Sequence, residues 1–407
     1  MDPQDQPVMV PVLHGPGGRR LRVAHLTTVG ISQAKLLATE LRVDVATGLD
    51  VTALCARDEY VPEVEALGVT YVALPALTRT WDPRRDAAAA RQLASTLRGL
   101  HLDVLHTHNP KTGVLGRLIG RAVGVPVVVN TCHGLWAQAH DPLARRSFVL
   151  GMEAVAAQAS HAELYQNDED RRTLARSVPQ WRARVVGNGT DLSSFGPDQR
   201  ARAAVRAEWG IDPDDVVVGG VGRLVAEKGI AEFAEAAQKL AGRARFVWVG
   251  PPDPDKPDAL TGDHDAVQFV GGRNDMAAVY NAFDVFVLPS YREGFSRSGM
   301  EAAATGLPLV LSDIRGCREV GRQEQEALLV PPADGAALTG AIERLLDDAG
   351  LRQRLGASAR RRALAEFDQV AVAAMSLQTY AAVANRKNLG WSVQHLPWPE
   401  LAKAHRG

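Results

Sequence analysis

The stretch FDVFVLPSYREGFSRSGMEAAATGLPLVLSD, residues 283–313, sets the expectations for the whole chain. Its first part, 283–288, is apolar and rich in β-branched and aromatic residues, which is typical of a buried parallel strand. A polar loop around Gly294 follows, and either Ser296 or Ser298 is suited to cap the start of a short helix. A Gly-Leu-Pro break then closes this helix before another apolar strand begins, so the stretch predicts a strand, a loop, a helix and a strand.

Two glutamates in this stretch, Glu293 and Glu301, are separated by seven residues and flank the N-terminus of the predicted helix. A helix N-terminus offers unpaired backbone N–H groups and the positive end of the helix dipole, which suits a phosphate. A ligand with a phosphate at the helix start and a polyhydroxylated group on each side would use all of these groups. A nucleoside diphosphate sugar is such a ligand, and two solvated glutamates beside a helix cap are the alternative.

The composition is that of an ordinary soluble globular protein. The 407 residues are too many for one small core, so two domains are expected. The 46 lysines and arginines nearly balance the 47 aspartates and glutamates, which gives no sign of a nucleic-acid partner. Three scattered cysteines show no pairing or metal-ligand pattern, which favours a reducing compartment, and we expect a cytoplasmic protein.

Strand and helix patterns alternate along most of the chain. Residues 1–18 predict a disordered leader without the apolar segment of a signal peptide. Residues 19–195 and 196–370 each alternate short β-rich runs with helical segments, which predicts two α/β domains with doubly wound parallel sheets. Residues 371–407 predict a C-terminal helix and tail that cross back to the N-terminal domain. Ligands of such sheets bind beyond the carboxyl ends of the strands, and we expect a cleft between the two domains.

Two cations follow the first predicted strand of the second domain. Arg223 stands at the strand exit, and Lys228 stands five residues later at the start of the next helix. Such cations can converge on a diphosphate, although an inert surface arginine and lysine would look the same on their own. Together with the helix start near Ser296 they predict a diphosphate site that needs no metal. The acids in residues 251–258 predict a solvated loop.

Three histidines, His106, His108 and His133, stand at or just beyond predicted strand ends. A histidine at the carboxyl edge of a sheet can hydrogen-bond a sugar hydroxyl or a phosphate oxygen. We expect this role for His133 and a packing role for His106, and both interpretations stay open for His108. A metal site at Cys132 and His133 is not favoured, because adjacent strand residues point to opposite faces.

Together these segments resemble glycosyltransferase family 4, whose members have the GT-B fold of two Rossmann-like domains facing a cleft. The similarity covers nearly all of residues 21–385 in the family's order. The matching segments are HTHNPKTG (106–113), TCHGLW (131–136), GNGTDLSSF (187–195), GRLVAEKG (222–229), LPSYREGFSRSGMEAAATGLPLV (288–310) and SDIRGCREV (312–320). The last segment resembles bacterial members that move N-acetylated hexosamines or related sugars onto lipid-linked or small-molecule acceptors.

The resemblance implies catalytic and donor-binding roles for the matching residues. Arg223 and Lys228 would neutralise the diphosphate leaving group, and Glu293 would hold hydroxyls of the donor sugar. Glu301 would accept both ribose hydroxyls, and His133 would face the donor sugar from the other domain.

Further positions are implied around these residues. The backbone amides of Gly294, Phe295 and Ser296 would lie near the β-phosphate, and the base would rest between Val270 and Arg273. On the acceptor side the candidates are Gly30, His108, Asn188 and Thr190. Departures from the family pattern at Gly30 and Thr190 make the acceptor the least transferable feature.

The resemblance implies a retaining glycosyltransferase, and the two cations with the helix start near Ser296 predict that it is metal-independent. Family members have no established protein nucleophile, and the leaving phosphate takes the acceptor's proton on the face from which it departs. We expect transfer from a UDP-sugar, with UDP-N-acetylglucosamine as first choice, to a small-molecule, lipid-linked or carrier-bound acceptor. No cofactor, metal ion or nucleic acid is expected, and the sequence does not itself indicate membrane contact.

Two other functions compete with this prediction. They are a GT-B sugar-nucleotide epimerase and a non-catalytic subunit that binds nucleotide sugars. The combination of the Glu-x7-Glu segment with both cations argues against the epimerase, and the retention of all donor residues argues against the subunit. A hydride-transferring dehydrogenase is excluded because residues 21–32 lack the G-x-G-x-x-G turn.

Overall fold

The computed structural model describes residues 7–137, 141–254 and 256–404, and the chain divides into two compact units. The first unit ends at Gly187 and resumes at Gln369, and the second unit is Asn188–Asp368. The chain therefore leaves the first unit earlier than the boundary predicted at 195. The C-terminal segment predicted to cross back belongs to the first unit.

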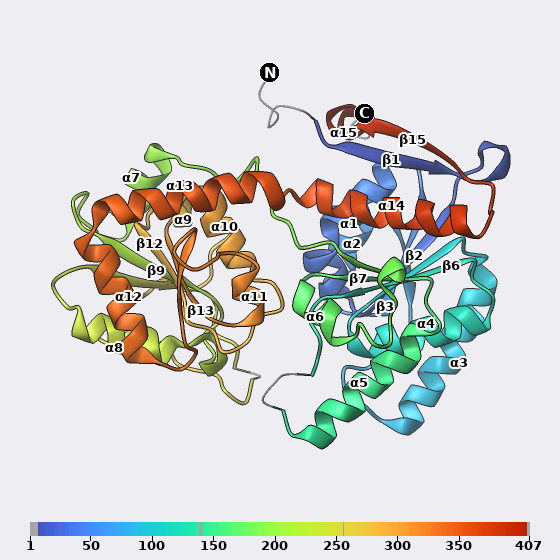
Figure 1. The fold of residues 1–407 in the computed structure, drawn as a ribbon, viewed down its shortest axis with the longest axis horizontal. Coiled ribbons are helices and arrows are strands. Elements are labelled where there is room, and N and C mark those ends of the chain that lie inside the picture. Colours follow the sequence, from blue (N-terminus) through green and yellow to red (C-terminus); the bar gives the residue numbers. More distant parts are fainter. Residues whose placement is uncertain (1–6, 138–140, 255, 405–407) are drawn as a thin grey trace. The chain divides into compact units, whose positions relative to one another are not determined.

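The first unit contains a parallel sheet of seven strands in the order β4-β3-β2-β5-β6-β7-β8, with helices on both faces (Figure 1). The strands are β2 (Arg22–Val29), β3 (Asp50–Ala56), β4 (Thr70–Ala73), β5 (Val104–His108), β6 (Val127–Cys132), β7 (Ala162–Tyr165) and β8 (Ala183–Val185). The helices are α1 (Ala38–Ala46), α2 (Val61–Glu65), α3 (Pro83–Leu100), α4 (Pro110–Ala122), α5 (Leu143–Ala157), α6 (Asp168–Thr173) and α14 (Gln369–Arg386).

Two buried clusters of apolar side chains cover the two faces of this sheet. Alternation along β5 places Val104 in the cluster beneath α1 and α14, and Leu105 in the cluster beneath α3. Tyr380 of α14 is completely buried in the first of these clusters, so the C-terminal helix is part of the core of this unit.

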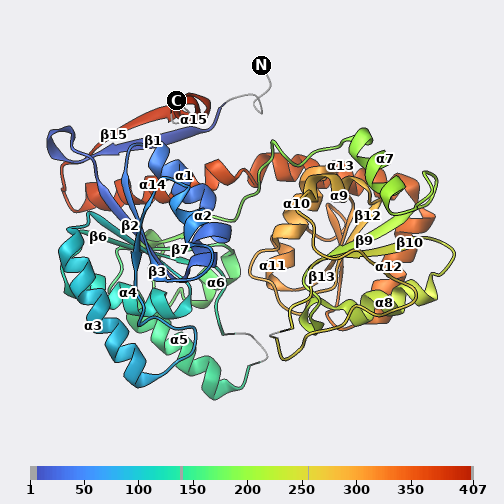
Figure 2. The ribbon, with the colours of Figure 1, turned by 180° about the vertical axis from the view of Figure 1, so that it is seen from behind.

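The prediction of a disordered leader is wrong for the described part of residues 1–18. Residues 1–6 lie outside the described ranges, but Met9–His14 form strand β1, which pairs antiparallel with β15 (Ser392–Pro397). Figures 1 and 2 show this two-stranded ribbon next to α14, with α15 (Trp398–Ala404) following it. Val10 and Leu13 of β1 are buried against α14, and this apolar contact packs the β1–β15 ribbon onto the first unit.

The second unit repeats the architecture with a parallel sheet of six strands in the order β11-β10-β9-β12-β13-β14. The strands are β9 (Val217–Val221), β10 (Arg245–Val249), β11 (Gln268–Phe269), β12 (Val285–Leu288), β13 (Leu309–Ser312) and β14 (Ala327–Val330). The helices are α7 (Gln199–Glu208), α8 (Ile230–Lys239), α9 (Met276–Asn281), α10 (Arg297–Thr305), α11 (Arg315–Arg318), α12 (Gly335–Asp347) and α13 (Ala349–Glu366).

The stretch that opened the sequence analysis forms β12, α10 and β13. Strand β12 is buried on both faces: Phe286 and Leu288 enter one apolar cluster, and Val285 and Val287 enter the other. Helix α10 begins after Ser296, whose hydroxyl accepts a hydrogen bond from the Gly299 amide over 3.1 Å. It ends at Gly306, whose φ of 90° is the left-handed conformation that terminates many helices.

Both sheets are doubly wound, and in each the strand order reverses at one position. In the first unit this switch point lies between β2 and β5, and in the second it lies between β9 and β12. At such a point the connections leave in opposite directions, which opens a crevice beyond the carboxyl ends of the two strands. Within the described ranges, none of the helices combines the length and apolar character that a membrane crossing requires.

Candidate functional site

The switch point of the second unit brings together two residues that the sequence placed in separate motifs. Lys228 follows β9, Glu293 follows β12, and the two strands are neighbours in the sheet. The Lys228 ammonium donates a hydrogen bond of 2.6 Å to Glu293 Oε1. Both side chains are mostly buried, with exposed fractions of 17% and 13%, so this ion pair is shielded from solvent.

Arg223 leaves the same strand β9, and its guanidinium is 41% exposed. It pairs with Asp253 and, over 3.4 Å, with Glu227. Most described residues of the predicted solvated loop 251–258 are exposed, but two of its acids have partners: Asp253 contacts Arg223, and Asp258 Oδ2 accepts a hydrogen bond of 3.0 Å from the Glu227 amide. Both acids follow β10, the other neighbour of β9 in the sheet, and Asp253 contacts Arg223. Asp255 lies outside the described residues.

The loop before α10 is held against the segment after β13. The Ser296 amide donates a hydrogen bond of 3.3 Å to the carbonyl of Gly316, and a side chain at Gly316 would lie 2.6 Å from the Glu293 carbonyl oxygen. Phe295 is 9% exposed and packs edge-on against Phe367 at a ring distance of 5.9 Å. Gly294 stands between these anchored residues, so the backbone around the helix start is fixed on both sides.

Glu301 lies in the second turn of α10 and is 8% exposed. Its Oε2 accepts a hydrogen bond of 2.9 Å from the Tyr280 hydroxyl, and its Oε1 accepts one of 3.1 Å from Arg297 Nε. Burial raises the pKa of the Glu301 carboxyl, although the Arg297 guanidinium opposes this effect. Two donors therefore hold the carboxylate in a fixed orientation.

The segment Val270–Arg273 follows the short strand β11 at the sheet edge next to β10. The Val270 amide bonds to the Trp248 carbonyl over 3.1 Å, which fixes the backbone there. The Arg273 guanidinium is held by Asp275 over 2.7 Å and by Glu208 over 3.1 Å. The side chain of Arg273 is thus occupied within the unit, and the backbone of 270–272 is the part that could contact a base.

The first unit contains the predicted histidines at its own switch point. His108 ends β5 and is completely buried, and His133 follows β6. His108 Nδ1 lies 3.0 Å from His133 Nε2, while the Nδ1 of His133 is buried and has no hydrogen-bond partner in the described structure. Burial lowers the pKa of His133 to about 4. His106 is buried between Tyr380 and Thr131, as the packing interpretation predicts.

The remaining acceptor-side candidates lie in different places. Gly30 follows β2, and a side chain there would overlap Asp58 Oδ1 at 2.1 Å, so the glycine allows this carboxylate to approach. Asn188 and Thr190 lie at the start of the second unit, which ends at Asp368. The Thr190 amide donates a hydrogen bond of 2.9 Å to the Phe367 carbonyl, so the start and the end of this unit lie side by side. Both residues therefore stand where the chain passes from the first unit to the second.

Sequence reasoning did not identify Tyr280, Asp253 or Gly316 as parts of the site. Tyr280 is separated from Glu301 by strand β12, and no local pattern couples the two residues. Asp253 stands in a Pro- and Asp-rich loop that looks solvated in sequence. Gly316 falls inside a segment that resembles the family, and a glycine within a helical pattern is the one signal that could have indicated a close backbone approach.

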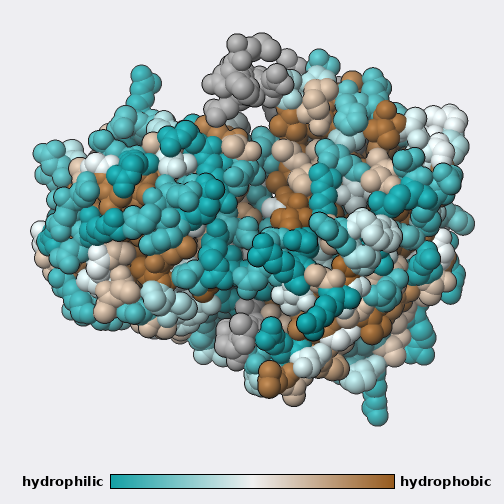
Figure 3. All heavy atoms as spheres, in the orientation of Figure 1, coloured by the Kyte–Doolittle hydropathy of each residue, from teal (hydrophilic) through white to brown (hydrophobic). Residues whose placement is uncertain are grey.

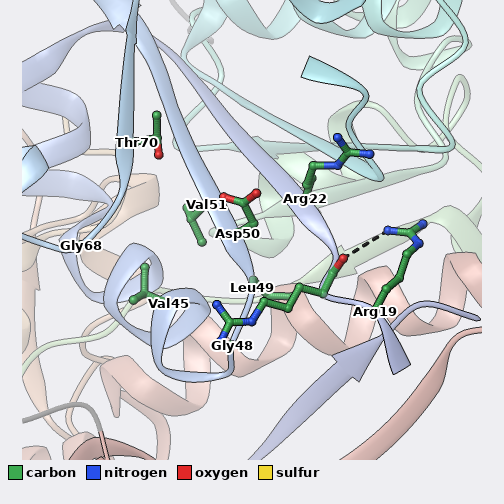
Figure 4. A pocket seen from close by; sticks show the side chains of 10 residues that line it. Arg19, Arg22, Val45, Gly48, Leu49, Asp50, Val51, Gly68 and Thr70 are labelled. Carbon is green, nitrogen blue, oxygen red and sulfur yellow. Dashed lines mark hydrogen bonds between the residues drawn. The ribbon is translucent and has the colours of Figure 1, made fainter. Parts of the chain in front are cut away.

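A pocket of about 510 Å³ lies at the amino ends of strands of the first sheet. Figure 4 shows the side chains that line it. Arg22, Asp50 and Thr70, which line it, begin β2, β3 and β4. Arg19 also lines it, but its guanidinium is bound to Asp103 over 2.6 Å and 2.8 Å. Since ligands of doubly wound sheets bind beyond the carboxyl ends, this pocket at the amino ends is not the candidate site.

Two doubly wound units, with polar groups gathered at the carboxyl ends of the strands, define the GT-B class of proteins. Residues 31–189 match the family model for a glycosyl transferase 4-like domain, and residues 215–348 match the model for glycosyl transferases group 1. Among solved structures, Anabaena HepE in complex with UDP and glucose has a TM-score of 0.76 at 17% identity, covering 89% of this chain and 100% of that chain.

Curated relatives agree with these models. The UDP-Gal:alpha-D-GlcNAc-diphosphoundecaprenol alpha-1,3-galactosyltransferase of Escherichia coli is 29% identical over 350 residues, which cover 81% of this chain and 89% of the relative. The D-inositol 3-phosphate glycosyltransferase of Salinispora arenicola is 30% identical over 365 residues, covering 81% and 80%. The chain therefore belongs to glycosyltransferase family 4.

Proposed function

We propose that the protein transfers a hexose or N-acetylhexosamine from a UDP-sugar to a lipid-linked sugar, with retention of anomeric configuration and without a catalytic metal ion. The observation that carries this proposal is the contact between Lys228 and Glu293 at the switch point of the second unit. A cation that would bind the diphosphate and a carboxylate that would bind the sugar hydroxyls lie side by side at the edge where such sheets bind ligands, which supports the proposal.

The donor would bind along the carboxyl ends of the second sheet. Glu301 would accept the ribose hydroxyls, and the backbone of 270–272 would contact the base. The amides of Gly294, Phe295 and Ser296 at the start of α10 would bind the β-phosphate. The uracil base is supported by the E. coli relative, whose name specifies UDP-Gal, and by the UDP complex of the HepE structure.

Catalysis would depend on positioning and on stabilisation of the leaving group. The bond between the anomeric carbon and the phosphate oxygen breaks, and its electron pair stays on the UDP. Lys228 and Arg223 stabilise that charge. The acceptor hydroxyl forms the new bond on the same face, and its proton passes to the departing phosphate oxygen. His133 would face the donor sugar and contribute to turnover there.

The sugar and acceptor are proposed from different observations. UDP-N-acetylglucosamine is the first donor to test because of the sequence resemblance, and UDP-galactose is the second because of the E. coli relative. A polyprenyl-diphosphate-linked sugar is the acceptor class named for that relative. Exposed apolar side chains on α5 suit an enzyme that works at a membrane surface: Leu143 is 79%, Phe148 66% and Val155 63% exposed. Figure 3 shows apolar side chains among hydrophilic ones over this part of the first unit.

The first experiment is a thermal-shift panel with UDP, GDP, ADP, dTDP and the UDP-sugars. We expect stabilisation by UDP and by one UDP-sugar, because a ligand that binds the folded state raises its stability by mass action. UDP release is then measured with a polyprenyl-diphosphate-linked acceptor analogue, and the product linkage is read by NMR. An α-linked product from an α-linked donor, at a rate that added Mg²⁺ or Mn²⁺ does not change, is the expected result.

Other outcomes would contradict parts of the proposal. Stabilisation by GDP or ADP alone would reject the uracil donor, and a β-linked product would reject retention. Binding of UDP-sugars with no release of UDP for any lipid-linked acceptor or inositol phosphate would favour the non-catalytic binding subunit instead.

A further inference from the structure

Four potential metal ligands lie together in the core of the first unit. His25 comes from β2, His106 and His108 come from β5, and Glu40 comes from α1. One ligand atom from each residue lies within 4.8 Å of the corresponding atoms of the others. The sheet register explains the gathering: His25 pairs directly with His106 on the neighbouring strand. His108 stands two residues further along and therefore points to the same face.

Two of the distances between these ligand atoms match those of donors around one metal ion. His25 Nδ1 lies 3.1 Å from His108 Nε2, and His106 Nδ1 lies 3.3 Å from Glu40 Oε1. Ligand atoms about 2.0–2.1 Å from a tetrahedral zinc ion are separated by about 3.3 Å. All three histidines are completely buried and the Glu40 side chain is 13% exposed, so the four side chains surround a position that is largely shielded from solvent.

The outward-facing nitrogen of each histidine has the partner that a metal-bound imidazole requires. A ligating histidine usually donates its second ring N–H to a carboxylate or another acceptor, which fixes its tautomer. His25 Nε2 lies 2.8 Å from Asp44 Oδ2, and His106 Nε2 lies 2.7 Å from Thr131 Oγ1. His108 Nδ1 lies 3.0 Å from His133 Nε2. Each ring thus has one nitrogen facing the shared centre and one held from outside.

Charge balance also favours a cation at the centre of this cluster. Glu40 and Asp44 lie one turn apart on α1, and in the described structure they contact the histidines His106 and His25 rather than lysines or arginines. The Oε1 atom of Glu40 is buried, and its contact with His106 Nδ1 over 3.3 Å is an ion pair only if that histidine is protonated. Buried carboxylates are costly unless they are paired or coordinate a metal. A divalent cation between three neutral imidazoles would balance both negative charges.

We propose that His25, Glu40, His106 and His108 bind one divalent metal ion, and that this ion is zinc. Three imidazoles with one carboxylate are a ligand set for zinc, and a site with four protein ligands and no open position is structural. The ion would tie β2, β5 and α1 together behind the carboxyl edge of the sheet. It would also orient His108, and through it His133. This departs from the sequence-based expectation that the protein holds no metal.

A hydrogen-bonded chain without metal is the competing account of the same cluster. In that chain a proton is shared between His25 and His108, and the Tyr380 hydroxyl, 2.6 Å from His106 Nδ1, satisfies that nitrogen. Zinc at His106 requires this hydroxyl to give way. Metal content distinguishes the two accounts directly.

The test uses the full chain with any affinity tag removed, purified with zinc present and then desalted. Elemental analysis should find about one zinc per chain. Glu40→Gln and His108→Asn should lose it, whereas His264→Ala, which removes an exposed histidine of the second unit, should retain it. Protein prepared without metal should gain thermal stability on addition of Zn²⁺, and with Co²⁺ it should show the visible absorption of a tetrahedral site.

Wild-type protein that is folded, lacks bound metal after purification with zinc, and gains no stability from Zn²⁺ would overturn the proposal and establish the hydrogen-bonded chain. Zinc retained equally by Glu40→Gln and His108→Asn would also overturn it, since the ion would then be bound elsewhere. If a variant fails to fold, the wild-type stoichiometry and cobalt spectrum still decide. None of these readouts depends on glycosyl transfer.

Discussion

Lys228 Nζ lies 2.6 Å from Glu293 Oε1, and this contact joins the exits of two neighbouring strands of the second sheet. Each residue is the other's partner in the free protein, and each is proposed to bind a different part of the donor. Binding of a diphosphate would therefore compete with Glu293 for the ammonium group. Substitution of the two residues should consequently have opposite effects on nucleotide binding.

We expect Lys228→Met to lower kcat/KM by about 100-fold, the loss typical of removing one charge-stabilising donor from a transition state. Lys239→Met is the matched control, because Lys239 forms an exposed ion pair on α8 with Glu235. Steady-state rates of UDP release give the comparison. Equal rates for both lysine variants would show that Lys228 does not act on the leaving group.

Glu293→Ala should reduce kcat while leaving the affinity for free UDP unchanged or higher, because it releases Lys228 for the phosphates. Calorimetry with UDP and turnover with the UDP-sugar separate the two effects. A loss of UDP affinity equal to the loss of kcat would place Glu293 on the nucleotide rather than on the sugar.

Glu301→Ala should weaken UDP binding by about 30-fold, which corresponds to about 2 kcal/mol for hydrogen bonds to a charged group. The raised pKa of Glu301 adds a pH dependence. Its carboxylate is protonated at higher pH than an ordinary glutamate, and protonation removes a ribose acceptor. Affinity for a UDP-sugar should therefore fall as the pH is lowered from 8 towards 5.

Glu301→Gln is the control for this pH dependence, because it should bind weakly with a flatter pH profile over the same range. A UDP-sugar is used in place of UDP, so that titration of a terminal phosphate does not contribute. Parallel profiles for the wild type and the glutamine variant would remove Glu301 from the ribose site.

Gly316→Ala should lower turnover although Gly316 carries no side chain that could bind a ligand. The added methyl group would lie 2.6 Å from the Glu293 carbonyl and would displace the loop before α10. Gly340→Ala, at a helical glycine of α12 with open space around it, should keep full activity. If both variants retain wild-type kcat, the position of this loop does not matter for transfer.

Serine substitutions at Phe148 and Val155 should reduce binding to vesicles that contain anionic lipid. These residues are seven positions apart on α5 and so share one face, next to the exposed Arg145. Val393→Ser, at an exposed position of β15, is the control. Co-sedimentation with vesicles measures the difference in binding between the wild type and the variants. Wild-type protein that does not sediment with the vesicles would refute the proposed contact between α5 and a membrane surface.

The amino-acid sequence determined the features that depend on neighbours in the chain. Alternating strands and helices predicted two doubly wound sheets. A serine cap at residue 296 or 298 and the Gly-Leu-Pro break predicted the bounds of the helix that the structure shows as α10. These features are local, because propensities, caps and glycine turns act over a few residues.

Tertiary structure decided which distant segments meet. Strand order places β9 beside β12 and so joins Lys228 to Glu293, and it places β2 beside β5 and so joins His25 to His106. Pairing of β1 with β15 likewise depends on two chain ends that no local pattern connects. The physical reason is that these contacts are fixed by burial of whole sheet faces and by long-range strand pairing, which short-range sequence patterns do not encode.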